Sequence, residues 1–206
     1  MGMSLGDNIR VTLFGESHGS SVGALLEGMP PGTKIDNDAL VRELERRKPG
    51  RKGMSRRLEA DQCEILSGVY EGRATGWPIL IIARNNDAKS SDYGFLPDHP
   101  RPGHADMVEI ERSGGAADLR GGGSQSARLT LGLVAAASQT RQLLSERGIH
   151  VRAHLHSVGD SQSRSLLDLD QTDETQKESM QRLNCLDPEA SELFSSVIES
   201  SRKELD

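Results

Sequence analysis

The sequence predicts an α+β domain in which one long helix is buried between two layers. Apolar and polar residues alternate over residues 8–14, which is typical of a half-buried strand. Residues 126–147 carry apolar side chains on more than one side of a helix, which indicates burial between layers rather than one exposed face. The 206 residues fit a single domain over 1–206.

Composition argues against several classes of protein. The chain has 31 acidic and 25 basic residues, a net charge of −6, and from Ser157 onward it holds 12 acidic and 5 basic residues. It therefore lacks the basic face of a nucleic-acid-binding protein. We see no charged-then-apolar leader, no apolar run near the roughly 18 residues of a membrane span, and no metal spacing between the cysteines. We expect a cytoplasmic protein with no nucleic-acid, membrane or metal partner.

The first part of the chain is predicted to form two strands and a helix. Strands are predicted at Asn8–Phe14 and Val22–Gly28, with a glycine-bounded loop between them. Asp36 is the expected cap of the helix, which ends in basic residues before a Pro-Gly turn. The apolar positions of this helix recur at helical spacing: Leu40, Val41 and Leu44.

A basic run extends past that helix through a loop. Cations in the last turn of a helix are ordinary capping, but here the run continues well beyond the turn. A loop this basic repels itself unless something negative binds there. Because no aromatic residues interleave, we interpret it as a patch for a small polyanion rather than a groove for single strands. The run comprises Arg46, Arg47, Lys48, Arg51, Lys52, Arg56 and Arg57.

The middle of the chain is predicted to form two more strands and a long loop. The strands are Cys63–Val69 and Ile79–Ala83, joined by a turn around residues 71–73. The polar, turn-rich loop Asn85–Pro102 follows. Loops of about this length in compact domains are usually functional or disordered.

The final part is predicted to form a strand and a helix. The strand Ile149–Val158 would place three histidines two or four residues apart on one face, a spacing open to metal ligands. No cysteine or acidic residue is placed to complete a metal site, so a polar strand face is favoured. A last helix starts at residues 187–189. The three histidines are His150, His154 and His156, and the apolar stripe of the last helix is Leu193, Phe194, Val197 and Ile198.

Two loops each hold one histidine that is suited to acid–base chemistry. The loop Gly15–Gly19 brackets a carboxylate, a hydroxyl and His18 between glycines, and imidazole titrates near neutrality without help. The alternative is a polar turn that satisfies its own backbone. In the loop 101–106, Pro and Gly fix the chain before His104, and we expect Asp106 to hold its imidazole. The alternative is a bystander histidine.

A third stretch combines a triple glycine with the start of the long helix. Gly121–Gly123 permit backbone angles that are closed to other residues and let another molecule approach the main chain. A helix start with free N–H groups binds anions, and Arg120 and Arg128 add guanidinium charge on either side. The alternative is a flexible turn before a helix.

Five motifs together make the chain resemble the chorismate synthase family over nearly its whole length. They occur in the order and spacing of that family, and five in register are far more specific than any one alone. The motifs are F-G-E-S-H-G at Phe14–Gly19, R-R-K-P-G at Arg46–Gly50, E-A-D-Q-C-E-I-L-S-G at Glu59–Gly68, R-P-G-H-A-D at Arg101–Asp106 and R-G-G-G-S-Q-S-A-R at Arg120–Arg128.

The resemblance implies a fold and a reaction. The fold would pack helices between two antiparallel sheets, here incomplete at the C-terminus because the family chain is far longer. The reaction would be the 1,4-elimination of phosphate from 5-enolpyruvylshikimate 3-phosphate to give chorismate, in the shikimate pathway of aromatic amino acid biosynthesis. It requires reduced FMN, which is not consumed overall. The family is also expected to be an NADP-linked, cytoplasmic, homotetrameric flavoprotein lyase.

The resemblance also implies roles for single residues. His18 would donate a proton to the departing phosphate or the flavin, and His104 would lie close to the reduced flavin. Two positions depart from the family pattern: Ser124 replaces a common arginine, and Gly53 replaces a second arginine after the Pro-Gly turn. The remaining implied site residues are Ser17, Arg47 and Arg128 for substrate, and Ser124, Gln125 and Ser126 for cofactor.

Two other functions stay open from the sequence. One is a truncated, non-catalytic remnant that keeps an anion-binding or oligomerisation surface. The other is a generic phosphate-binding module, which would bind many phosphates without preference.

Overall fold

The computed structural model describes residues 3–47, 61–85, 90–169 and 183–204. The described residues fall into two compact units, the first up to Ile149 and the second from His150 onward. All of the site residues named above that are described lie in the first unit. The prediction of a single domain over 1–206 stays a prediction.

The first unit is built on a five-stranded antiparallel sheet with the strand order β1-β2-β3-β7-β4. Three of the strands were predicted within one or two residues, because their alternating or continuous apolar pattern is strong. The strands are β1 (Ser4–Leu5), β2 (Arg10–Gly15), β3 (Ser21–Glu27), β7 (Ile79–Arg84) and β4 (Cys63–Ile65).

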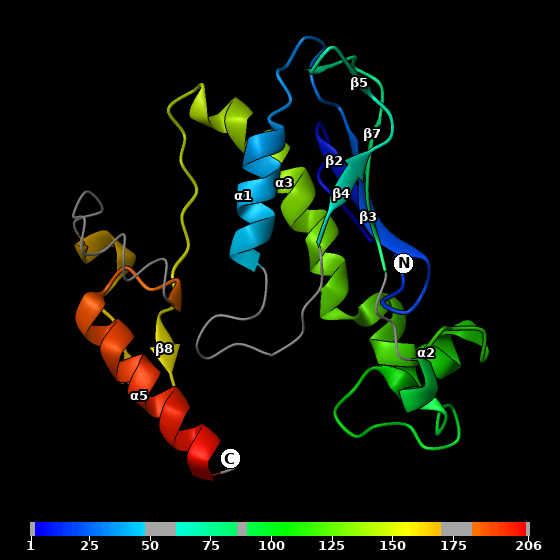
Figure 1. The fold of residues 1–206 in the computed structure, drawn as a ribbon, viewed down its shortest axis with the longest axis vertical. Helices are drawn as coiled ribbons and strands as arrows, with labels where there is room; N and C mark the ends of the chain where they lie inside the picture. Colours follow the sequence, from blue (N-terminus) through cyan, green and yellow to red (C-terminus); the bar gives the residue numbers. More distant parts are fainter. Residues whose placement is uncertain (1–2, 48–60, 86–89, 170–182, 205–206) are drawn as a thin grey trace. The chain divides into compact units, whose positions relative to one another are not determined.

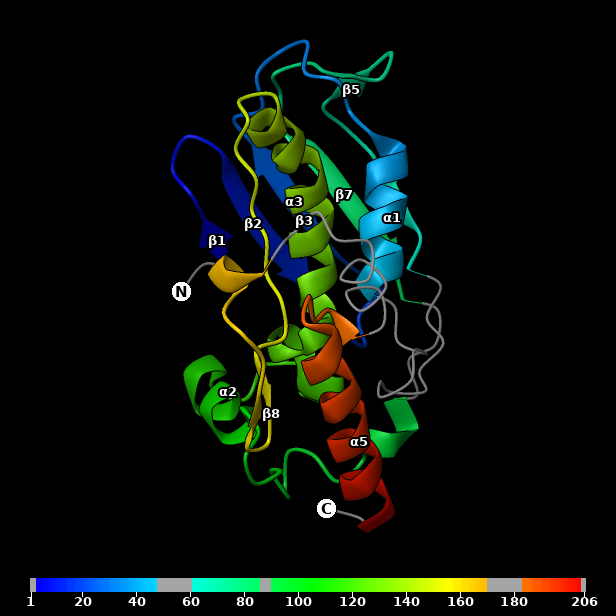
Figure 2. The ribbon, with the colours of Figure 1, turned by 90° about the vertical axis from the view of Figure 1, so that its left-hand side faces the viewer.

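Two helices, α1 and α3, lie side by side on one face of this sheet (Figures 1 and 2). α1 is Asn37–Arg47 and α3 is Thr130–Ser145. The Asp36 side chain accepts a hydrogen bond from Ala39 N at 2.9 Å, so the predicted N-cap of α1 is confirmed. α3 crosses the sheet closely, because a Cβ at Gly132 would lie 2.4 Å from the carbonyl oxygen of Gly23.

The core of the first unit lies between the sheet and these helices. Alternate residues of β3 and β7 point toward the helices and are fully buried, and each contributes roughly 1.5–3 kcal/mol relative to an exposed side chain. The core includes Val22, Leu26, Ile79 and Ile81 from the sheet, Leu40 and Leu44 from α1, and Leu131, Ala135 and Leu143 from α3. The α+β class with antiparallel sheets is confirmed. The second sheet of the sandwich stays a prediction.

Smaller elements connect these layers. The predicted strand Cys63–Val69 is interrupted, because Gly68 adopts a φ of 77° and separates β4 from a small hairpin. The hairpin pairs β5 (Val69–Tyr70) with β6 (Arg73–Ala74) through the predicted turn. Short 3₁₀ turns η1, η2 and η3 occupy Ser90–Tyr93, Arg120–Gln125 and Ala127–Leu129.

One helix, α2 (Asp106–Ser113), was not predicted. Its amphipathicity is inverted. The apolar side chains of Met107 and Val108 are 69% and 65% exposed, while the carboxylates of Asp106 and Glu109 are buried against arginines. A hydrophobic pattern cannot reveal a helix of this kind.

The second unit corrects one prediction. The strand Ile149–Val158 does not form over residues 149–156, and only β8 (Ser157–Val158) pairs, with β9 (Ser161–Gln162). Alternation alone favoured a strand, but Ile149 and Val151 are 49% and 60% exposed, and only Leu155 and Val158 of the segment pack on the core of the second unit. The last helix is confirmed as α5 (Pro188–Glu204), after a short turn η4 (Leu166–Asp168).

Two absences apply to the described residues only. No helix among them is long and apolar enough to cross a membrane. They also contain no group of three or more His, Cys, Asp or Glu that could hold a metal ion, and this includes the His150–His156 segment.

Candidate active site

The His18 loop, residues Glu16–Gly19, packs against the triple glycine. It connects β2 to β3, and Ser17 N donates to the carbonyl oxygen of Gly123 at 3.1 Å. The hydroxyl of Ser17 contacts His18 Nδ1 at 3.1 Å and donates to the carbonyl oxygen of Arg120 at 3.0 Å. Two motifs that lie about a hundred residues apart in the sequence thus meet in one place.

The triple glycine is required by geometry. Gly121, Gly122 and Gly123 have φ values of 61°, 94° and 52°, a left-handed run that only glycine adopts at low cost. A Cβ at Gly121 would lie 2.2 Å from His18 Cε1 and 2.4 Å from His18 Nδ1. The glycine therefore lets the imidazole of the same chain rest directly on the main chain. The sequence predicted that another molecule approaches the glycine run, and that stays a prediction.

A helix follows the bend as predicted, but α3 begins at Thr130 rather than at Ser126, because a 3₁₀ turn occupies Ala127–Leu129. The hydroxyl of Ser126 accepts a hydrogen bond from Arg128 N at 3.3 Å, and α3 begins after the short turn η3. Gln125 instead donates to Glu109 Oε1 at 3.1 Å. The Ser124 hydroxyl has no hydrogen-bond partner among the described residues.

A tyrosine that the sequence did not single out packs on His18. The Tyr93 ring meets the imidazole edge to face, with centroids 4.9 Å apart and planes at 76°. On Tyr93 lies the guanidinium of Arg101, 5.4 Å from the ring centroid. Such aromatic and cation–π contacts each stabilise the arrangement by about 0.5–1 kcal/mol.

The surroundings of His104 differ from the prediction. His104 is exposed, and its backbone N donates to Arg101 O at 3.3 Å. Asp106 does not serve as its holder, because its carboxylate accepts from Arg101 Nε at 2.8 Å and Nη2 at 2.7 Å. These hydrogen bonds lower the pKa of Asp106 from 3.8 to about 2, against the opposing effect of burial, and His104 adds only a small further lowering.

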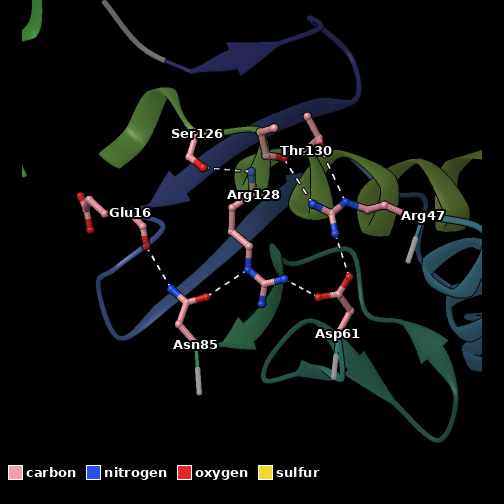
Figure 3. Close-up of polar contacts among 8 residues, drawn as sticks. Glu16, Arg47, Asp61, Asn85, Ser126, Arg128 and Thr130 are labelled. Carbon is pink, nitrogen blue, oxygen red and sulfur yellow. Dashed lines mark hydrogen bonds and ion pairs between the residues drawn. The ribbon is translucent and has the colours of Figure 1, made fainter. Parts of the chain in front are cut away.

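Two arginines and one carboxylate form a cluster beside the helix start, in which Asp61 and Arg128 are buried and Arg47 is partly exposed (Figure 3). Arg47 Nη1 donates to Asp61 Oδ2 at 2.7 Å, and Arg128 Nη1 donates to Asp61 Oδ1. Arg47 also reaches Ala127 O at 3.3 Å and Thr130 Oγ1 at 3.4 Å. Because two guanidinium groups share one carboxylate, the cluster keeps one net positive charge.

Asn85 links this cluster to the His18 loop (Figure 3). Its Oδ1 accepts from Arg128 Nε at 3.1 Å, and its Nδ2 donates to the carbonyl oxygens of Glu16 at 3.0 Å and Gly19 at 2.9 Å. Hydrogen bonds thus connect Arg47 to Glu16 through Asp61, Arg128 and Asn85 in turn (Figure 3).

The other predicted positions are distributed as follows. Arg120 is paired with Asp118, at 2.8 and 2.6 Å, which lowers the pKa of that carboxyl. Arg46 pairs with Glu43 at 2.7 Å. The rest of the basic run, residues 48–57, lies outside the described residues.

The structure therefore brings most of the predicted positions together. Direct hydrogen bonds or ring contacts connect Ser17, His18 and the glycine bend, and a second set connects Arg47, Arg128 and the His18 loop. His104 belongs to the neighbouring turn of Arg101 and makes no side-chain hydrogen bond among the described residues. The roles assigned to these residues stay predictions.

Sequence reasoning missed three residues of the site: Asp61, Asn85 and Tyr93. Asp61 lies inside one of the five motifs, but Glu59 and Glu64 flank it there, so no local signal distinguished it from its acidic neighbours. Asn85 and Tyr93 lie in the long loop after β7, whose length was itself the only indication of function.

Comparisons with known proteins identify the family. The family model for chorismate synthase matches residues 9–206. The chorismate synthase of Aeropyrum pernix is 46% identical over 203 residues, which is 98% of this chain and 53% of that protein. The chorismate synthase of Methanosarcina mazei is 40% identical over 208 residues, covering 100% of this chain and 55% of that protein.

A solved structure supports the same conclusion. A crystal structure of chorismate synthase matches with a TM-score of 0.69 and 28% identity, over 96% of this chain and 54% of that chain. The fold and the sequence together place this α+β chain in the enzyme class to which that crystal structure belongs. The chain belongs to the chorismate synthase family. It spans about half the length of the curated relatives it matches.

Proposed function

We propose that this chain supplies a large part of a chorismate synthase active site, in which 5-enolpyruvylshikimate 3-phosphate loses phosphate to give chorismate. The observation that carries the proposal is the contact between His18 and the glycine bend, since it joins two of the five family motifs through a hydrogen-bonded hydroxyl. Family membership supports the same reaction.

The reaction sets clear demands on the site. In the 1,4-elimination the C–O bond to phosphate breaks, a proton leaves the far end of the four-carbon unit, and a new double bond forms. The departing phosphate carries two negative charges and needs fixed cations and proton donors. The cluster of Arg47, Arg128 and Asp61 supplies one net positive charge at the helix start, and His18 and Ser17 lie beside it.

In this proposal His18 donates its proton to the departing phosphate, and Ser17 holds the ring by its contact at Nδ1. The positive charges of Arg47 and Arg128 stabilise the anionic phosphate of the bound substrate. His104 is exposed on the turn next to Arg101, where its ring can meet a bound molecule.

The residues present fit reduced FMN in part. The cofactor is anionic, and the bend offers the Ser124 hydroxyl, which has no partner within the described part of the chain, and space at Gly122, where a Cβ would lie 3.7 Å from Ser126 Cβ. We propose Ser124, Gln125 and Ser126 as the residues that would hold it. When bound, reduced FMN would supply electron density to the substrate and recover it, without net consumption. A link to NADP, a homotetrameric assembly and a cytoplasmic location are proposed from the family alone.

A second candidate is a non-catalytic remnant that keeps an anion-binding or oligomerisation surface. The observation that favours it is length, since the chain covers 53% of the relative from Aeropyrum pernix. Positioning supplies much of the rate of an enzyme, so a partial site loses activity steeply.

Anaerobic assay of the chain with reduced FMN, measuring chorismate and phosphate, tests the proposal. If the chain turns over, His18→Ala is expected to lower kcat by about 10²–10⁴, while His99→Ala, an exposed histidine of the neighbouring loop, leaves it unchanged. Flavin titration distinguishes the alternatives. FMN binding with turnover supports the enzyme, and neither, in a folded sample, supports the remnant. Binding of many phosphates without preference would favour a generic module.

A further inference from the structure

The buried carboxylate of Asp61 has no catalytic or binding role in the resemblance or in the proposed function. Its side chain is fully buried, and each of its oxygens accepts a hydrogen bond from a different arginine, Oδ2 from Arg47 and Oδ1 from Arg128. A group with no accessible surface and both oxygens occupied cannot itself contact a substrate. Its effect must pass through the arginines that it holds.

Arg128 passes that effect onward. Its residue is 8% exposed, and its planar fork binds Asp61 through Nη1 and Asn85 through Nε. The rigid fork is what allows one side chain to hold two partners in fixed directions. A lysine, which concentrates its charge at one atom, cannot span both.

Asn85 connects Arg128 to the backbone of the His18 loop. It follows the last residue of β7, where its backbone N donates to Ser20 O at 3.1 Å. Its side-chain amide donates to the carbonyl oxygens of Glu16 and Gly19, the first and last residues of the His18 loop, and its Oδ1 accepts from Arg128. The Asn85 amide therefore holds the two ends of the His18 loop together, and the hydrogen bond from Arg128 fixes the orientation of the amide.

We propose that Asp61, Arg128 and Asn85 are positioning residues, a buried relay that holds the His18 loop against the glycine bend. The relay acts on His18 through the loop backbone and does not touch the reacting atoms. It refines the role that the resemblance implied for Arg128, because two protein partners occupy the guanidinium that was expected to meet substrate. The effect of the relay on turnover rests on the proposed function of His18, but its effect on the conformation of the loop does not.

Amide hydrogen exchange of the 206-residue chain, measured residue by residue by NMR, tests the relay. The reporter amides are Ser17, which donates to Gly123 O, and Gly19, which donates to Glu16 O. The variants are Arg128→Lys, which keeps the charge and removes the fork, and Asp61→Asn, which keeps the shape and removes the charge. Both are expected to speed exchange at the reporters roughly tenfold or more, because buried hydrogen bonds of the relay are lost.

The matched control is Glu64→Gln. It removes a carboxylate three residues from Asp61, in the exposed ion pair with Arg84, and is expected to leave the reporters unchanged. Unchanged protection of the reporters in a folded Arg128→Lys variant would overturn the proposal. If Asp61→Asn does not fold, Asn85→Ala replaces it, with the same expected increase. Equal loss of protection across the β3–β7 pairing in every folded variant would also overturn it, since the cluster would then only stabilise the fold.

A turnover assay separates this proposal from the proposed function. Faster exchange in the variants with no turnover of the wild-type chain supports the relay and counts against the enzyme. If the chain turns over, the relay predicts that Arg128→Lys lowers kcat at least about tenfold, while KM changes less, because the lysine keeps the positive charge near the substrate but His18 is misplaced. Retained kcat in Arg128→Lys would contradict the relay while leaving the proposed function standing.

Discussion

The two histidines of the site have similar sequence surroundings and very different structural ones. Both lie in short loops that contain glycine, and both were expected to be held in place. His18 is half-buried and meets a hydroxyl, a glycine bend and a tyrosine ring that come from three separate parts of the chain. His104 is exposed, and its expected carboxylate partner belongs to Arg101. A local motif indicates a candidate residue, but long-range packing determines how tightly its side chain is held.

The sharpest way to break this comparison is to add one methyl group at each loop. Gly121→Ala puts a Cβ at 2.2 Å from His18 Cε1, in a backbone with a φ of 61°. Gly103→Ala, beside His104, has a similar φ of 74° but nothing within 4 Å of the new Cβ. We expect Gly121→Ala to lower the free energy of unfolding by about 2–4 kcal/mol, and Gly103→Ala by only about 1 kcal/mol.

Urea denaturation of both variants measures the difference. Equal losses would mean that backbone strain alone is felt at both sites, and that the imidazole is not packed on the bend as described. A larger loss for Gly103→Ala would reverse the contrast between the two loops.

The second prediction concerns Asp106 and its dependence on pH. The folded pKa of this carboxyl is lowered to about 2 from 3.8, chiefly by the hydrogen bond from Arg101. Its contribution to stability is therefore complete above about pH 4 and is lost as the pH falls through about 2. We expect Asp106→Asn to cost about 1–2 kcal/mol near neutral pH and to converge with wild type toward pH 2.

Thermal unfolding at a series of pH values checks this, with Asp98→Asn as the control, because Asp98 is exposed in the loop that precedes α2. A constant difference between Asp106→Asn and wild type down to pH 2 would show that the carboxylate charge contributes nothing.

The third prediction sharpens the account of His18. Ser17→Ala removes the contact with His18 Nδ1 and the hydrogen bond to Arg120 O. We expect a loss of about 1 kcal/mol in the free energy of unfolding, with a change in the chemical shifts of the His18 ring. Ser20→Ala, an exposed serine two residues past His18, serves as the control. Unchanged chemical shifts of the His18 ring in Ser17→Ala would mean that the Ser17 hydroxyl does not hold the imidazole.

The smallest expected effect on stability is at the other histidine. Because His104 is exposed and makes no side-chain hydrogen bond among the described residues, His104→Gln should change the free energy of unfolding by less than about 0.5 kcal/mol. Any effect on turnover would then be chemical rather than structural. A loss of stability as large as that of Ser17→Ala would show that the His104 side chain makes stabilising contacts, and the contrast between the two histidines would then be wrong.

Much of the first unit could be predicted from the sequence because local patterns are strong there. The apolar alternation of β2, β3 and β7 and the Asp36 cap of α1 act within a few residues, and each was confirmed. The glycine bend was also foreseen, since three consecutive glycines have few explanations other than a left-handed backbone.

Each failure lies where the apolar pattern of the sequence does not decide the structure. α2 buries its carboxylates against Arg101 and Arg112, which lie just before the helix and within it, and it exposes Met107 and Val108, so it has no apolar stripe to predict. The relay from Asp61 to Asn85 depends on pairings over 43 and 67 residues of sequence, which no local pattern encodes. Residues 149–156 alternate like a strand, but a strand needs a partner, and sequence alternation does not supply one.

The contact between His18 and the triple glycine is the claim on which the site depends. A nuclear Overhauser measurement on the 206-residue chain, between the His18 ring protons and the Gly121 α-protons, tests it directly. The account predicts a strong cross-peak, because the α-carbon of Gly121 lies against the imidazole. A His18 ring with cross-peaks only to its sequence neighbours, in a chain whose β2–β3 pairing is intact, would contradict it.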